Sequence, residues 1–203
     1  MGFFSKVTEM PWLHQGLPEE GAQTGEFASS AKKVALVMFL AVVTSIFFLF
    51  SMAYVERMEL FDWYPVEEPM VLWLNTVFLI VASFAMQRAR KALSSQSAPY
   101  KGALMLGGLM AIAFLVGQYL AWGELRSNGL YAVTNPASAF FYVLTALHGV
   151  HLLGGVYVWA RTMWRSRSDA DRESIAESVD LCSVYWHYLL LLWLVLFALM
   201  LNT

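Results

Sequence analysis

Three histidines of this chain lie inside apolar segments, where imidazole could do chemistry. His148 and His151 are three positions apart, so a helix would present both on one face, and His187 follows in a later segment. Two such imidazoles can bind a metal ion or hydrogen-bond a neighbouring helix. A metal site needs three or four ligands, and Cys182, at the far end of another segment, is the only thiol. Structural hydrogen bonding between helices is therefore the favoured interpretation.

Heme ligation is the second chemistry open to these residues. His187 together with His148 or His151 would clamp a heme between two helices, as in a membrane b-type cytochrome. A catalytic heme-copper centre would need more histidines than the four in the whole chain. The b-type alternative stays open, and a Soret band of the isolated chain that disappears on His187→Ala would establish it.

Uncharged polar residues occur in two further apolar segments, Asn75 and Thr76 in one and Gln118 in the next. Hydrocarbon offers them no hydrogen-bond partners, so we expect them to tie helices together. Each such tie is worth on the order of 0.6–2 kcal/mol. The apolar segments contain no Lys, Arg, Asp or Glu, which argues against a pump or a proton-coupled transporter.

The apolar segments are the elements that must position these side chains. Of 203 residues, 59% are hydrophobic and 14% charged, and the mean hydropathy is +0.55, which is too apolar for a water-soluble domain. A spanning helix needs about 20 apolar residues. Five such runs are present, at about 34–54, 70–86, 102–122, 136–160 and 181–201.

These runs predict an all-α, polytopic membrane protein. Residues 32–203 should form a bundle of five transmembrane helices, after a polar N-terminal segment, 1–31, that is disordered or lies on the membrane surface. The first, third and fifth hydrophilic segments carry three, four and four Lys or Arg, and the other two carry one each. This pattern predicts a cytoplasmic N-terminus and a periplasmic C-terminus. A net charge of −2 offers no basic surface for nucleic acid.

Two motifs carry a family resemblance. Residues 140–151, FFYVLTALHGVH, followed by the glycine pair 154–155, resemble the signature helix of heme-copper oxidase (cytochrome c oxidase) subunit III. Residues 185–188, YWHY, with Trp193 further on, resemble the last helix of that family. The resemblance covers about residues 34–203, and the family's short bacterial members also have five helices.

The resemblance implies an accessory, non-heme-binding subunit III of a bacterial aerobic terminal oxidase in the inner membrane. Such a subunit packs on catalytic subunit I, with subunit II in the same complex, binds phospholipid in a cleft, and supports proton uptake and stability in aerobic electron transport. The complex is a proton-translocating oxidoreductase whose heme and copper lie in the partner subunits, so no catalytic, cofactor or metal site is expected in this chain. The candidate inter-helix or lipid-cleft residues are Asn75, Thr76, Gln118, Glu124, His148, His151, Trp186 and His187.

Two positions depart from the family pattern. Val43 stands where the family's equivalent of the first helix usually has a glutamate, and Leu190 stands where the last helix of the family usually has an aspartate. Both changes remove an intramembrane carboxylate, which weakens a proton-antenna role but leaves hydrophobic packing intact. Because nothing in the chain selects cytochrome c over quinol or oxygen over nitric oxide, an accessory subunit of a quinol oxidase or of a nitric oxide reductase is the alternative.

Overall fold

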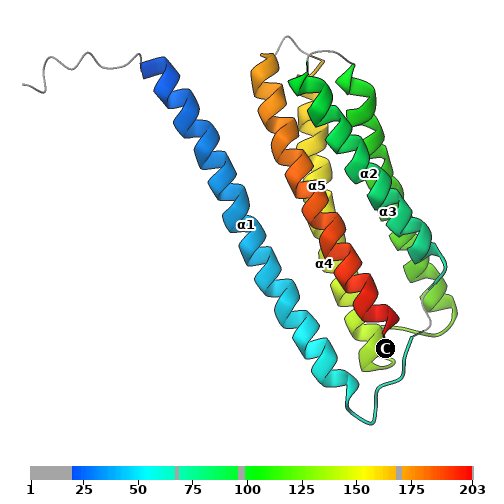
Figure 1. Cartoon of the computed structure of the whole chain (residues 1–203). Helices are drawn as coiled ribbons and strands as arrows, with labels where there is room; N and C mark the ends of the chain where they lie inside the picture. The colour runs from blue at the N-terminus through cyan, green and yellow to red at the C-terminus, as the bar shows by residue number, and fades with distance from the viewer. Residues whose placement is uncertain (1–19, 67–68, 96–98, 168–170, 203) are drawn as a thin grey trace, which may run out of the picture. The chain divides into compact units, whose positions relative to one another are not determined.

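The computed structural model describes residues 20–66, 69–95, 99–167 and 171–202. Five helices follow one another in these ranges, and they are shown in Figure 1: α1 (Glu20–Met58), α2 (Val71–Ser94), α3 (Tyr100–Ser127), α4 (Pro136–Arg165) and α5 (Arg172–Leu201). All five contain a stretch that is long and apolar enough to cross a membrane, and the described ranges contain no strand. The predicted all-α class with five membrane-spanning helices is confirmed.

The helices extend beyond the apolar runs that predict them. α5 begins at Arg172, whereas the apolar run begins at residue 181, because polar residues continue the helix past the hydrocarbon. α1 begins at Glu20, within the predicted polar segment 1–31, and residues 1–19 lie outside the described residues. The orientation of the two termini across the membrane stays a prediction.

The chain divides after Phe39 into two units. In the first, the described residues form the beginning of α1. The second unit holds the rest of α1 and the helices α2–α5, which lie side by side in Figure 1. α3 packs on α2 and α4, and α5 also packs on α2 and α4, so these four helices close into a bundle. Within this unit, the Thr44 and Tyr188 hydroxyls share a hydrogen bond of 2.9 Å that ties α1 to α5.

Close packing of α3 against its neighbours depends on glycines, which have no side chain. A Cβ added at Gly117 would lie 2.0 Å from Oδ1 of Asn75 in α2, and one added at Gly108 would lie 1.9 Å from the Trp159 ring in α4. The indole of Trp159 uses this space to donate a hydrogen bond of 2.7 Å to the Leu104 carbonyl. The glycines of α3 thus let both neighbouring helices approach its backbone.

The connection between α3 and α4 is set by local sequence signals. Gly129 has a φ of +77°, a conformation that costs glycine least, and Leu130 N donates to the Leu125 carbonyl at 3.0 Å to close α3. Asn135 caps α4 by accepting a hydrogen bond of 2.8 Å from Ser138 N. These bonds fix the loop that forms the pocket described below.

Candidate functional site

His148 is enclosed at the centre of the bundle. Its side chain is fully buried, and its ring centroid lies 5.5 Å from that of Phe114 in α3 and 5.2 Å from that of Trp193 in α5. Neither ring nitrogen has a hydrogen-bond partner among the described residues. Aromatic rings therefore occupy the space beside this imidazole, where a heme would have to lie.

Trp193 connects this centre to α2. Its indole N–H donates a hydrogen bond of 2.9 Å to the Thr76 hydroxyl, which in turn donates 2.9 Å to the Leu72 carbonyl. The Trp193 ring also meets Phe114 edge-on, with centroids 4.8 Å apart. Thr76 thus lies at a junction of α2 with α5, and the side chains of Trp193 and His148 link that junction to α3 and α4.

Asn75 and Gln118 form a second buried contact, between α2 and α3. Asn75 Nδ2 lies 3.4 Å from Gln118 Oε1, and both side chains are almost completely buried. Asn75 Oδ1 and Gln118 Nε2 have no hydrogen-bond partner among the described residues. The pair reaches this geometry because Gly117 leaves room for the Asn75 amide.

His151 has different surroundings from His148 although the two share a helix face. Its Nδ1 lies 2.6 Å from the Leu147 carbonyl, and its ring meets Phe47 of α1 at 5.5 Å. The main-chain carbonyl of His151 accepts a hydrogen bond of 2.8 Å from the Tyr185 hydroxyl in α5. His151 is therefore placed where α4 meets α1 and α5.

Trp186 and Glu124 occupy contrasting positions. Trp186 is 1% exposed, lies against Gly155 of α4, and has an indole N–H without a partner among the described residues. Glu124 is exposed near the end of α3, where its main-chain carbonyl accepts a hydrogen bond of 2.7 Å from the Ser127 hydroxyl. Of the two, only Trp186 takes part in the packing between helices.

His187 lies on an exposed face of α5 and does not meet the other two histidines. Its Nδ1 lies 2.6 Å from the Ser183 carbonyl of its own helix. Trp193, which touches His148, is six residues further on, about 9 Å along the axis and about 120° around it. Tyr185, which touches His151, is two residues earlier and so about 160° away. His187 therefore lies on another side of α5 than the residues that contact His148 and His151, and the pair of axial ligands that the b-type alternative requires does not form.

The described residues contain no group of three or more His, Cys, Asp or Glu that could hold a metal ion. Cys182 is buried and lies in α5, in the same helix as His187. The arrangement of imidazoles, amides and indoles in the bundle is suited to holding helices in register.

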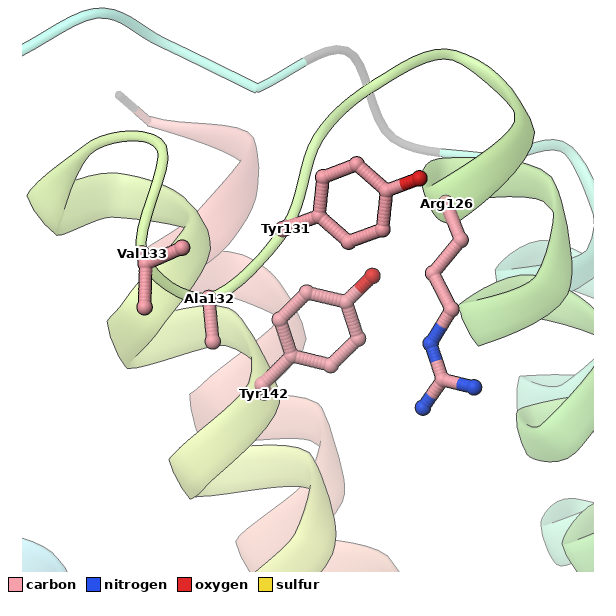
Figure 2. A pocket seen from close by; sticks show the side chains of 5 residues that line it. All are labelled: Arg126, Tyr131, Ala132, Val133 and Tyr142. Atoms are coloured by element: carbon pink, nitrogen blue, oxygen red, sulfur yellow. The ribbon is translucent and has the colours of Figure 1, made fainter.

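Sequence reasoning missed a pocket of about 300 Å³ between the end of α3 and the start of α4, shown in Figure 2. It is lined by Arg126, Tyr131, Ala132, Val133 and Tyr142. Figure 2 shows the hydroxyl ends of both tyrosines on the side where the Arg126 side chain leaves its helix, with the guanidinium at the other end of that side chain. The Tyr142 hydroxyl also donates 3.0 Å to the Leu130 carbonyl, which holds its ring in place. A guanidinium at the end of a membrane-spanning helix suits an anion such as a phosphate.

A signal for this pocket was present in the sequence. Arg126 is one of only two cations in the hydrophilic segments predicted to face the periplasm, and tyrosines follow it at the predicted span ends. The folding of loop 128–135 around Gly129 brings them together, and that turn could not be read from the apolar pattern.

Comparison with known proteins gives one consistent result. A family model described as cytochrome c oxidase subunit III matches residues 1–202. The chain is 30% identical over 171 residues to cytochrome c oxidase subunit 3 of Synechocystis sp., an alignment that covers 81% of this chain and 72% of that protein. It is 28% identical over 129 residues to cytochrome c oxidase subunit 3 of Thermostichus vulcanus, covering 63% of each. A probable cytochrome c oxidase subunit 3 of Mycobacterium tuberculosis is 28% identical over 90 residues, 44% of each chain.

Proposed function

Because this chain belongs to the cytochrome c oxidase subunit III family, we propose that it is the accessory, non-heme-binding subunit III of a bacterial aerobic terminal oxidase. The family belongs to an oxidoreductase complex, and its subunit III is not the catalytic subunit. The chain is a multi-pass membrane protein. Its proposed location is the bacterial inner membrane, with the N-terminus cytoplasmic and the C-terminus periplasmic, as the distribution of Lys and Arg predicts.

The enclosure of His148 is the observation that carries the supportive role. Its imidazole is sealed between Phe114 and Trp193, and the neighbouring polar groups pair across helices. Side chains used in this way define one arrangement of α2–α5. We infer that the bundle acts as a rigid body that packs on catalytic subunit I, with subunit II in the same complex and with heme and copper in those partners.

Support for proton uptake would then act through packing rather than through a carboxylate of this chain. Val43 is 2% exposed among apolar neighbours of the core, and Leu190 is half-buried. Neither can exchange a proton. The proposed contribution is to hold the proton-uptake side of subunit I in its working conformation and so to maintain the stability of the complex during turnover.

Phospholipid binding is part of the same proposal. The pocket at Arg126 supports it, since a guanidinium beside two tyrosines at a helix end suits the phosphate of a lipid headgroup. Hydrocarbon chains of that lipid would continue along the exposed face of α3, where Tyr119, two turns before Arg126, is 69% exposed.

Mild detergent extraction of the tagged, full-length chain tests this function. We expect it to co-purify with a polypeptide that contains two hemes and copper, and the preparation should reduce oxygen with cytochrome c as donor. Quinol oxidation or reduction of nitric oxide would assign the chain to one of the alternative complexes. A stoichiometric heme or metal centre in the chain freed of its partners would refute the accessory role.

A further inference from the structure

One face of α5 is exposed and carries a regular stripe of side chains. It consists of Val184, His187, Leu191, Leu194 and Ala198, at successive intervals of three, four, three and four residues. The apolar members Val184, Leu191 and Leu194 are 41%, 62% and 43% exposed. Alternating intervals of three and four residues place all five on one side of a helix, in the pattern of a helix–helix seam. We call these five residues the α5 stripe.

His187, the polar member of the stripe, has one ring nitrogen that can accept a hydrogen bond. His187 Nδ1 lies 2.6 Å from the Ser183 carbonyl, and a carbonyl only accepts, so the proton is on Nδ1. In the neutral imidazole, Nε2 is then an acceptor. The ring is exposed, so this acceptor points out of the bundle toward whatever surrounds α5.

Lipid cannot donate to this acceptor at the depth where His187 lies. Asp180, paired with Arg90 at 2.5 Å, is the nearest charged residue of α5 that precedes it. His187 follows seven residues later, about 10 Å further along the helix and inside the apolar run. Acyl chains contain no donor, and an unpaired polar atom in hydrocarbon costs several kcal/mol.

We propose that the α5 stripe packs against a transmembrane helix of a neighbouring subunit and that this helix donates a hydrogen bond to His187 Nε2 from a hydroxyl, an amide or an indole N–H. The inference rests on the proposed function for the existence of a neighbouring subunit. The spacing of the stripe gives a crossing near +20°, the geometry of left-handed helix packing. Small Ala198 at one end lets the partner backbone approach, and Leu191 and Leu194 supply the apolar contact.

Site-specific photocrosslinking of the assembled complex tests the surface directly. Leu191 is replaced by p-benzoylphenylalanine, and the matched control carries the same residue at Leu109, which is 44% exposed on α3. The contact of Trp193 with Phe114 places the two positions within about one helical turn in depth. We expect position 191 to give an adduct with a membrane-spanning chain of the co-purified oxidase, and Leu109 to give mainly lipid adducts.

Substitutions of His187 test the hydrogen bond. His187→Leu removes the acceptor, whereas His187→Gln keeps one near the position of Nε2. We expect His187→Leu to lower the amount of partner retained per chain by about fivefold, the value of one hydrogen bond in a membrane, and His187→Gln to restore it. Tyr157→Leu, which removes an exposed polar ring from α4, is the control and should retain the wild-type amount.

The outcomes separate this inference from the proposed function. If the wild-type chain co-purifies with a heme- and copper-containing partner but position 191 yields only lipid or intrachain adducts, the stripe is not the interface and the function stands. If position 191 is crosslinked to a membrane-spanning chain of an assembly without heme and copper, the surface stands and the function fails. Equal retention of partner by His187→Leu and His187→Gln would refute the role of Nε2, and the crosslinking result holds even if the leucine variant does not fold.

Discussion

Substitution of Gly117 tests whether the Asn75–Gln118 contact depends on the missing side chain in α3. A Cβ at this position would lie 2.0 Å from Asn75 Oδ1, far inside van der Waals contact, and Asn75 is fully buried. The amide must therefore rotate away or the helices must separate. Overpacking of this kind costs about 1–3 kcal/mol. Loss of the Asn75–Gln118 hydrogen bond adds about 0.6–2 kcal/mol.

The same helix provides a matched control. A Cβ at Gly123 meets nothing within 4 Å. Gly123→Ala therefore keeps only the gain in helix propensity of about 1 kcal/mol. Gly117→Ala has the same gain but carries both penalties, so we expect it to unfold more easily than Gly123→Ala by about 2–5 kcal/mol. Helix content followed by circular dichroism during denaturant titration in detergent measures the difference.

A second substitution identifies the cause. Asn75→Ala alone loses the hydrogen bond, but it also removes the atom that the new Cβ would strike. In the double variant Asn75→Ala/Gly117→Ala, both penalties for the alanine at 117 should largely disappear, which gives a coupling energy of about 2–5 kcal/mol. Equal stability of Gly117→Ala and Gly123→Ala, or strictly additive effects in the double variant, would show that α2 and α3 do not approach as closely as described.

Three further predictions concern other contacts. Thr76→Val removes the acceptor of the Trp193 indole and should lower the unfolding free energy by about 0.6–2 kcal/mol; Trp193→Phe loses the same bond as well as ring contacts, so the loss in the double variant should fall short of the sum of the two single losses by that amount, and strict additivity would contradict the contact. Arg126→Gln should weaken binding of spin-labelled phospholipid, whether anionic or zwitterionic, because both carry the phosphate, but not of a spin-labelled diacylglycerol, which lacks it; equal effects on phospholipid and diacylglycerol would remove the phosphate assignment. Hydrogen bonds from Arg57 hold the pKa of Asp62 below its ordinary value. The stability that this contact contributes is therefore complete above the unfolded pKa of about 4 and is lost as the pH falls through the lower folded pKa. Acid titration of Asp62→Asn should lack this transition, and its persistence would refute the assignment.

The sequence was sufficient to predict the helices and the family. In a bilayer the backbone N–H and C=O groups of an apolar run of about 20 residues must pair with one another, and a helix does this within a single segment. It was also sufficient to show that Asn75, Thr76 and Gln118 need partners, and the structure places all three at helix contacts. The partners themselves could not be predicted, because they depend on the rotation of each helix within the bundle.

The two histidines of α4 show this limit most clearly. Three residues correspond to about 300° of rotation, so His148 and His151 share a face only to within about 60°. In a bundle, that difference is enough to give one ring to Phe114 and Trp193 and the other to Phe47. The pocket at Arg126 was missed for another reason, since it is created by the chain reversal at Gly129 rather than by any periodic pattern.

The buried polar groups of this bundle are better suited to specifying its arrangement than to stabilising it. Asn75 and Gln118 make one long hydrogen bond and leave an acceptor and a donor unpaired among the described residues, and His148 makes none there. An apolar interior of the same shape would avoid these desolvation costs. The hydrogen bonds from Asn75 to Gln118 and from Trp193 to Thr76 nevertheless penalise any alternative rotation that would turn these side chains toward lipid, where no partner exists. A subunit that works through the shape of its outer surface depends on this restriction, because the α5 stripe can face a neighbouring helix only if α5 keeps its rotation.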